Sequence, residues 1–291
     1  MVKKYSQLYL DARKLLLDSE DAPNAATYAR QLLCHVTGKT LEQVLADGEM
    51  YASESVCEAM ESAVRRLLEG EPLAYILGKW EFYGLQLVVN EHVLIPRDDT
   101  CAVTSLAIEH ALFLDKAPRV LDLCTGSGCI GLAIASRVPD ARVTLADISS
   151  EALSVAKKNT ALNRLTGRVS CVVSDALSAP SKFLGKFDLI VSNPPYITTQ
   201  EMKELPHSVS GFEPHLALHG GTDGLDFYRS IIDHYTGNLK PGGYLCFEFG
   251  YGQGDAICGL LQAKGYTILE RSRDYNDRER AVIAQYGRKE I

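Results

Sequence analysis

Residues 119–131 have the sequence Arg-Val-Leu-Asp-Leu-Cys-Thr-Gly-Ser-Gly-Cys-Ile-Gly, in which a short apolar strand runs into a glycine-rich turn and an apolar helix then begins. Glycines let the backbone turn tightly and approach a ligand closely. Gly126, Gly128 and Gly131 fit the G-x-G-x-x-G spacing, and Asp147 follows about 20 residues later, where the next predicted strand ends. The pattern predicts a nucleotide-binding α/β domain in which the Asp147 carboxylate accepts hydrogen bonds from ribose hydroxyls.

A second loop, Asn193-Pro194-Pro195-Tyr196, follows an apolar strand predicted at 187–192. Two prolines cannot continue a central strand, so this loop lies at the carboxyl edge, where open α/β sheets bind ligands. Prolyl peptides offer carbonyl acceptors without N–H donors. The Asn193 side-chain oxygen and the Pro194 carbonyl therefore suit the two N–H bonds of a planar –NH₂ group, with the Tyr196 ring over its flat face. We predict that Asn193, Pro194 and Tyr196 are catalytic.

Two features argue against a dinucleotide dehydrogenase. Asp122 lies ahead of the glycine turn, where a carboxylate would oppose a pyrophosphate but can accept hydrogen bonds from an amino-acid ammonium. Hydride transfer also has no need of an Asn-Pro-Pro-Tyr loop. A ligand with a ribose, an ammonium, a sulfonium and no phosphate satisfies each point. We therefore predict S-adenosyl-L-methionine as the cofactor, with S-adenosyl-L-homocysteine as its product.

The chain resembles the class I amino-methyltransferases in four successive motifs, at 122–128, 146–149, 174–177 and 192–196. It also resembles the release-factor glutamine N5-methyltransferases (the HemK/PrmC family) at 70–78, 81–85, 93–97 and 218–225. The resemblance runs from about residue 70 to the C-terminus and is weaker before it. It implies methylation of the side-chain amide nitrogen of a glutamine in peptide chain release factors, which tunes translation termination.

The site residues that follow from the motifs and the resemblance fall into two sets. The cofactor set, with Asp147 at the ribose and Asp175 at the adenine edge, is Asp122, Thr125, Gly126, Ser127, Gly128, Asp147, Ile148, Asp175, Ala176 and Asn193. The substrate set is Asn193, Pro194, Pro195, Tyr196 and Arg97. One departure from the family is Cys124, which stands where the first loop glycine is usual. A residue with a Cβ atom is expected to keep φ below zero there.

From about residue 100 onward predicted strands and helices alternate, which indicates a doubly wound, Rossmann-like sheet of seven strands. The loop between the last two strands is too short for a crossover helix, so we expect an antiparallel hairpin there. The strands are predicted near 119–123, 142–148, 169–174, 187–192, 243–249, 267–271 and 280–286. The helices are predicted near 100–115, 129–137, 150–163, 225–239 and 251–264.

The N-terminal third has helical periodicity and predicts a small bundle, with helices over 5–18, 23–38 and 53–69 and a short one that begins after Thr40. Thr40 and Gln43 have the spacing of a capping box. The apolar runs 80–89 and 93–95 predict a β-hairpin linker. We therefore expect a helical substrate-docking domain at 1–75, a hairpin linker at 76–98 and a methyltransferase domain at 99–291. A purely stabilising role for the helical domain is the alternative.

Composition limits the class of protein further. A net charge of −7 over 291 residues disfavours binding that depends on neutralising many phosphates, so no direct nucleic-acid contact is expected. No apolar stretch reaches the ~20 residues of a membrane span. The N-terminus lacks an apolar leader, which predicts a cytoplasmic protein. The eight cysteines show no C-x-x-C pair or zinc spacing, so we expect reduced thiols and no metal.

Two other functions stay open at this point. One is an N6-adenine or N2-guanine methyltransferase that acts on a flipped base, since such enzymes share the Asn-Pro-Pro-Tyr motif. It would need a basic recognition domain, and the acidic chain shows none. The other is a regulator that binds S-adenosylmethionine without catalysis, which the intact acceptor loop disfavours.

Overall fold

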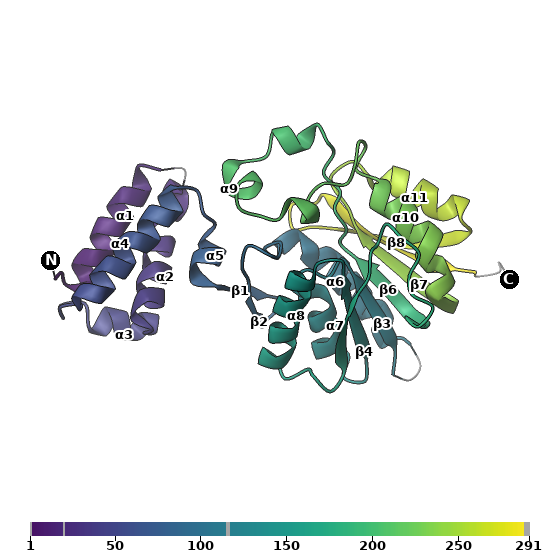
Figure 1. Cartoon of the computed structure of the whole chain (residues 1–291), viewed down its shortest axis with the longest axis horizontal. Coiled ribbons are helices and arrows are strands. Elements are labelled where there is room, and N and C mark those ends of the chain that lie inside the picture. The colour runs from purple at the N-terminus through teal and green to yellow at the C-terminus, as the bar shows by residue number, and fades with distance from the viewer. Residues whose placement is uncertain (1, 20, 115–116, 288–291) are drawn as a thin grey trace. The chain divides into compact units, whose positions relative to one another are not determined.

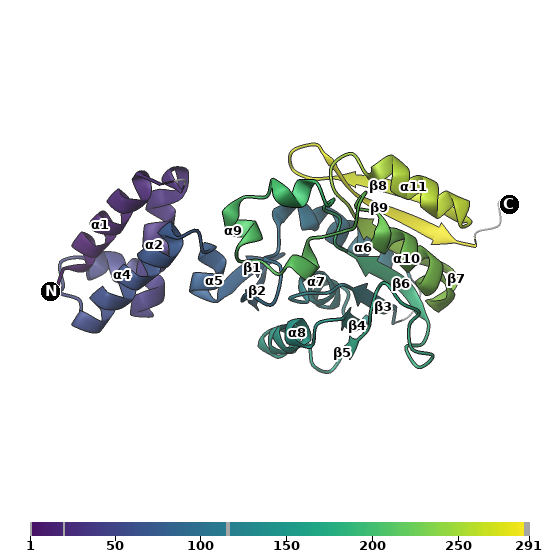
Figure 2. The ribbon, with the colours of Figure 1, turned by 45° about the horizontal axis from the view of Figure 1, so that its top comes forward.

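The computed structural model of the chain describes residues 2–19, 21–114 and 117–287. The last residue of the helix predicted at 100–115 and the C-terminal residues 288–291 lie outside this part of the chain. Two compact units are distinguished, and Figures 1 and 2 label their elements. The first comprises Met1–Gly78 with His207–Phe212, and the second Lys79–Pro206 with Glu213–Ile291.

The first unit is a helical bundle, as its periodicity predicts. Its longer helices pack their apolar faces into one core around Leu16, Leu32 and Met60. The capping box is confirmed: Thr40 Oγ1 accepts from Gln43 N at 3.3 Å, and Thr40 N donates to Gln43 Oε1 at 3.0 Å. The helices are α1 (Tyr5–Leu17), α2 (Ala25–Thr37), α3 (Leu41–Ala46), α4 (Glu54–Leu68), α5 (Leu73–Leu77) and α9 (His207–Ser210), with a 3₁₀ turn at Ala22–Asn24.

The second unit is built on a seven-stranded sheet with strand order β5-β4-β3-β6-β7-β9-β8. Strands β3 to β7 are parallel to one another, and the predicted antiparallel hairpin of β8 and β9 is confirmed, with β9 inserted between β7 and β8. The strands are β3 (Arg119–Leu123), β4 (Arg142–Asp147), β5 (Val169–Val173), β6 (Phe187–Ser192), β7 (Leu239–Glu248), β8 (Tyr266–Arg273) and β9 (Glu279–Tyr286).

Helices cover both faces of this sheet, because successive strand residues alternate between two apolar layers. Val120 and Leu189 point into the layer under α6, α7 and α8, whereas Leu121 and Ile190 point into the layer under α10 and α11. Figure 1 shows α10 and α11 together on one face. The helices are α6 (Cys101–Leu112), α7 (Cys129–Arg137), α8 (Ser150–Leu162), α10 (Asp226–Tyr235) and α11 (Gly254–Ala263).

The order of the strands creates a switch point beside β3. The chain moves outward from β3 through β4 to β5, and then returns to the opposite side of β3 as β6. The connections that leave β3 and β6 therefore diverge at their carboxyl ends and open a crevice between them. The glycine loop follows β3 and the Asn-Pro-Pro-Tyr loop follows β6, so both motifs flank this crevice.

The hairpin before the sheet differs from its prediction. Its strands are β1 (Lys79–Phe82), which begins one residue before the first predicted run, and β2 (Leu85–Val88), which lies inside that run. Residues 93–95 form no strand. The turn is made by Tyr83 and Gly84, which both have positive φ, 52° and 80°. Such a two-residue turn matches the twist of antiparallel strands and closes the hairpin earlier than the apolar pattern predicts.

Candidate active site

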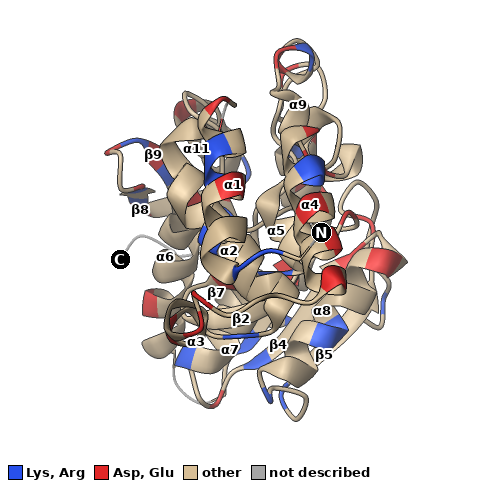
Figure 3. Ribbon diagram, turned by 90° about the vertical axis from the view of Figure 1, so that its left-hand side faces the viewer, with Lys and Arg blue, Asp and Glu red and all other residues tan. Residues whose placement is uncertain are grey.

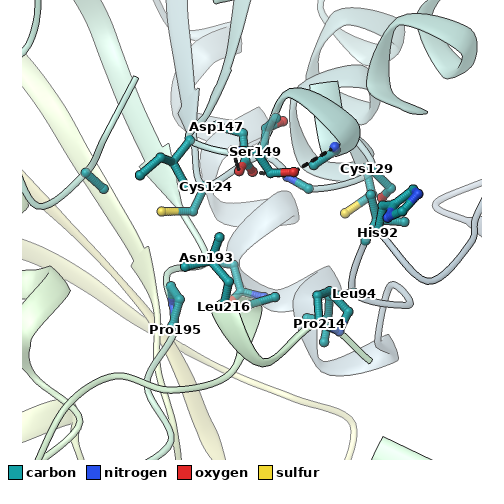
Figure 4. A pocket seen from close by; sticks show the side chains of 18 of the residues that line it. His92, Leu94, Cys124, Cys129, Asp147, Ser149, Asn193, Pro195, Pro214 and Leu216 are labelled. Atoms are coloured by element: carbon teal, nitrogen blue, oxygen red, sulfur yellow. Dashed lines mark hydrogen bonds between the residues drawn. The ribbon is translucent and has the colours of Figure 1, made fainter. Parts of the chain in front are cut away.

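A pocket lies in the crevice at the carboxyl edge of the sheet. Its non-atom space, including the opening to solvent, is about 1020 Å³. Figure 4 shows Asp147 and Ser149 on one side, with Asn193, Pro195 and Leu216 across from them. The walls come from the loops after β3, β4, β5 and β6, and from two segments around 92–100 and 214–217. A concave site formed by the loops at several strand ends is the usual place for a small-molecule ligand in this fold.

The Asp147 carboxylate holds two loops in place while it faces the pocket. Its Oδ2 accepts from the Gly126 N–H at 2.8 Å, and its Oδ1 accepts from the Ser149 N–H at 3.0 Å. Burial raises the pKa of Asp147, against these backbone hydrogen bonds, which lower it. Each carboxylate oxygen has a second lone pair, so both can still accept a hydrogen bond from a ligand.

Asp122 lies behind the glycine loop and is fully buried. Its Oδ2 accepts from Thr125 Oγ1 at 2.6 Å and from the Gly131 N–H at 2.9 Å. Burial raises its pKa to about 7. A Cβ atom at Gly131 would lie 2.9 Å from this carboxylate and 2.3 Å from Leu145 Cδ2, so the third glycine is needed for packing. Asp122 thus ties the glycine loop to the start of α7.

The Asn-Pro-Pro-Tyr loop is held from behind by the 218–225 segment that the sequence resemblance includes. Ile197 N donates to Leu218 O at 3.0 Å, and Gly220 N donates to Ile197 O at 2.8 Å. A Cβ atom at Gly220 would lie 2.6 Å from the Pro195 carbonyl oxygen. Gln253 Nε2 also donates to Tyr196 O at 3.0 Å. The backbone of the loop is therefore fixed independently of any ligand.

The structure brings most of the predicted cofactor residues onto the pocket wall. Those that line it are Thr125, Gly126, Ser127, Asp147, Ile148, Asp175, Ala176 and Asn193. Asp122 and Gly128 are not among the lining residues. Gly128, with φ of 85°, precedes the first residue of α7.

Some of the predicted substrate residues line the pocket and others do not. Asn193 and Pro195 line the pocket, whereas Pro194 is buried and Tyr196 packs, half-buried, against the core beneath α10 and α11. The Arg97 guanidinium forms an ion pair with Glu213.

Apart from Arg97, sequence reasoning assigned no role to residues of the two segments that complete the pocket, 92–100 and 214–217. Glu213 joins them, because its buried carboxylate binds Arg97 and also accepts from Ile95 N at 3.1 Å. Residues 93–97 belong to a motif of the resemblance, which is the one sequence signal that marks them. The lining residues that sequence reasoning missed are His92, Val93, Leu94, Pro96, Thr100, Cys124, Cys129, Ile130, Ser149, Ala152, Ser174, Leu177, Pro214, Leu216, Ala217 and Phe227.

The expectation for Cys124 was wrong: its φ is 60°, in the left-handed region. The glycine turn requires that conformation at its first position, and Thr125 N bonds to Ala146 O at 3.0 Å just beyond it. Burial raises the pKa of the Cys124 and Cys129 thiols, so both are neutral groups on the pocket wall. All eight cysteines are free, and the described residues contain no group of three or more His, Cys, Asp or Glu that could hold a metal ion.

We expect the Cys124→Gly variant to be more stable than Cys124→Ala by about 1 kcal/mol, because alanine keeps the left-handed strain that glycine lacks. Both changes remove the thiol, so the difference reports the backbone alone. Denaturant unfolding measures it. The control is the same pair of substitutions at Cys129, the first residue of α7, where alanine should be the more stable of the two. Equal stability of the two Cys124 variants would mean that the turn relaxes.

Comparison with known proteins identifies the class of protein to which this fold belongs. The family model described as "Methyltransferase small domain" matches residues 102–208, and the model described as "PrmC N-terminal domain" matches residues 7–78. A solved structure of a methyltransferase from Pyrococcus furiosus shares the fold, with a TM-score of 0.52 at 18% identity over 78% of this chain and 99% of that one. The seven-stranded sheet with its inserted antiparallel strand is thus a methyltransferase fold, and the match to the methyltransferase family model assigns the chain to the methyltransferases.

Relatives of known function identify the family within the methyltransferases to which the chain belongs. The release factor glutamine methyltransferase of Chlorobaculum tepidum is 41% identical over 260 residues, which are 87% of this chain and 88% of that protein. A bifunctional methyltransferase of Rickettsia typhi is 37% identical over 271 residues, and the chain spans about half of its length, 52%. The chain belongs to the family of release factor glutamine methyltransferases.

Proposed function

We propose that the chain transfers a methyl group from S-adenosylmethionine to the side-chain amide nitrogen (N5) of a glutamine in a peptide chain release factor, and so tunes translation termination. The observation that carries the proposal is the position of Asn193. Its amide stands at the end of β6 on the wall of the pocket whose other side is formed by Asp147. An acceptor for a carboxamide therefore adjoins a site suited to a ribose.

The residues around the pocket fit S-adenosylmethionine, which supplies an electrophilic methyl group on a sulfonium. Asp147 has free lone pairs for ribose hydroxyls. The buried Ser127 hydroxyl has no hydrogen-bond partner among the described residues, so it is available to a polar group of the ligand. Ile148, Ala176 and Leu177 offer an apolar wall beside Asp175 for a planar base.

The same arrangement supports the chemistry. A carboxamide nitrogen is a poor nucleophile, because its lone pair is delocalised into the carbonyl. Asn193 Oδ1 and the Pro194 carbonyl, as acceptors for its two N–H bonds, hold the nitrogen and favour a pyramidal geometry. As the nitrogen attacks, it gains positive charge and its protons become better donors. Both hydrogen bonds then strengthen in the transition state, which is the condition for catalysis. S-adenosylhomocysteine would leave as the neutral thioether, and the methylated nitrogen would lose one of its protons to solvent.

Mass spectrometry of a release factor incubated with the enzyme and S-adenosylmethionine tests the proposal. We expect one added methyl group on a single glutamine, located by fragmentation of the peptide. A release factor with that glutamine replaced by glutamate is the control and should gain none. Methylation of DNA or RNA bases, with no methylation of any release factor, would contradict the proposal.

No helix among the described residues is long and apolar enough to cross a membrane.

We further propose that the helical domain, residues 1–75, docks the release factor. A groove whose non-atom space, including the opening to solvent, is about 890 Å³ lies between α1 and α4, with an apolar floor that includes Leu8, Ala12 and Val64. Two leucines on its walls, Leu15 and Leu68, are 53% and 43% exposed. Acidic and basic residues are mixed on α1 and α4 around it (Figure 3). Such an apolar groove with a polar rim suits a protein partner.

Replacing Leu15 and Leu68 with serine is expected to raise the KM for intact release factor about tenfold, since an interface contact of this size is worth roughly 1.4 kcal/mol. Cofactor affinity and kcat should stay unchanged. The control is Leu10→Ser, because Leu10 is 50% exposed on the same helix but does not line the groove. An unchanged KM in the double variant would leave the helical domain with a structural role alone.

A further inference from the structure

Glu248 is a buried acid beside the active-site loop to which the mechanism above assigns no role. Ser192 of β6 pairs with Phe247 of β7, so the next residues, Asn193 and Glu248, stand level at the carboxyl ends of two neighbouring strands. Glu248 is 1% exposed, and its Oε2 has no hydrogen-bond partner among the described residues. A buried carboxyl at this position requires an explanation, because burying such a group is costly.

The surroundings of Glu248 are polar and rigid. Burial raises its pKa to about 8, against hydrogen bonds with the Thr100 and Asn193 side chains and the charge of Arg280, which lower it. Thr100 Oγ1 accepts from Asn193 Nδ2 at 3.3 Å. The Glu248 carbonyl oxygen accepts from the Tyr228 hydroxyl at 2.8 Å, which holds the backbone. The –NH₂ group of Asn193 therefore lies against the hydroxyl oxygen of Thr100 and the carboxyl group of Glu248.

These acceptors decide which end of the Asn193 amide faces the pocket. A carboxamide has donors at one end and an acceptor at the other, and its neighbours select between the two orientations. Acceptors behind Asn193 bind its –NH₂ group and leave Oδ1 for the pocket. With the amide turned by half a revolution, its –NH₂ group would meet the –NH₂ group of the substrate, and two donors form no hydrogen bond.

We propose that Glu248, together with Thr100, is a positioning residue that fixes the Asn193 amide with its oxygen toward the substrate amide. This inference rests on the proposed function. Glu248 itself contacts neither substrate nor cofactor in this role. Its contribution is made before substrate binds, because the orientation is set within the folded protein.

Single-turnover methyl transfer to release factor at saturating S-adenosylmethionine tests the proposal. Glu248→Met, which removes the acceptor at similar size, should slow transfer about 10- to 100-fold, less than the loss of the Asn193 hydrogen bond itself. Glu248→Gln keeps a carbonyl acceptor and should stay within about threefold of wild type. Cofactor affinity should be unchanged in both. Transfer at the wild-type rate by Glu248→Met, or equal impairment of the methionine and glutamine variants, would overturn the proposal.

Three further variants separate the positioning role from an effect on folding. Thr100→Val removes the other acceptor and should slow transfer severalfold. Its matched control is Thr236→Val, a buried threonine of the same unit that bonds to Ile232 O and Tyr266 away from the pocket. In an Asn193→Ala background, Glu248→Met should slow transfer no further, since the amide it orients is gone. Additive losses would show that Glu248 acts by another route.

Hydrogen exchange of the Asn193 side-chain –NH₂ group gives a readout independent of activity. Its NMR signals are assigned by their loss in Asn193→Ala. They should be protected from exchange in wild type and Glu248→Gln, and should exchange faster in Glu248→Met. If the wild type methylates no release factor, the proposed function fails and the exchange data still decide the orientation. Exchange that is fast in wild type, or unaltered by Glu248→Met, would overturn the positioning role.

Discussion

Asn193→Ala is expected to lower kcat for release factor methylation by about 10²–10³, the loss seen when one preorganised transition-state hydrogen bond is removed. In the proposed mechanism the Asn193 amide oxygen is a neutral acceptor, which holds the substrate –NH₂ group without taking a proton from it. Alanine removes this acceptor and leaves the Pro194 carbonyl in place. Single-turnover methyl transfer at saturating cofactor measures the effect.

The fold and the cofactor affinity of Asn193→Ala should stay nearly intact. The loop backbone is held by hydrogen bonds to Leu218, Gly220 and Gln253, none of which involves the Asn193 side chain. Asn193→Asp is the sharper comparison: it keeps the shape and an acceptor, but adds a charge beside the proposed site of the sulfonium, and we expect it to be impaired less than alanine. Near wild-type turnover by Asn193→Ala would show that the loop is structural and that the chemistry lies elsewhere.

Asp147→Ala is expected to weaken S-adenosylhomocysteine binding by roughly 1.5–3 kcal/mol, about 10- to 150-fold, the range for a hydrogen bond to a charged group. The structure gives a second reason for a large effect. Asp147 also holds the Gly126 and Ser149 N–H groups, so its removal loosens two of the loops that form the pocket. Isothermal calorimetry with S-adenosylhomocysteine and with NAD makes the measurement.

The control for this variant is Asp188→Ala. Asp188 also accepts a backbone N–H, from Arg119 at 2.8 Å, and pairs with Lys240, but it is not among the residues that line the pocket. It should change stability without changing affinity. Tight binding of NAD and no binding of S-adenosylhomocysteine by the wild type would contradict the predicted cofactor. Full affinity in Asp147→Ala would remove this residue from the cofactor site.

The features that the sequence predicted well are those set by neighbours in the chain. The two faces of the sheet follow from alternation within single strands, as in Val120 and Leu121. The prolines after Ser192 end β6 because a proline cannot donate to the ladder, whatever surrounds it. The Thr40 capping box joins residues three apart. Such interactions can be predicted from the periodicity or the spacing of residues in the sequence.

Local pattern alone does not determine the conformations of Cys124 and of the hairpin. The left-handed φ of Cys124 is forced on it by the turn that joins β3 to α7, in spite of its Cβ atom. The hairpin closes at Tyr83 because Phe82 and Leu87 are buried in the core of the second unit. In both cases tertiary packing outweighs the conformational preference of a single residue.

The tertiary structure alone decided which motif residues face the pocket. Asp122 and Asp147 both follow from the glycine-loop pattern, yet one lies behind the loop and the other on the wall. Arg97 pairs with Glu213, 116 residues away, and Asn193 bonds to Thr100, 93 residues away. These partners meet because the order of the strands brings distant loops to one edge of the sheet. Contacts between residues so far apart cannot be predicted from spacing in the sequence, because they depend on how all the residues between them fold.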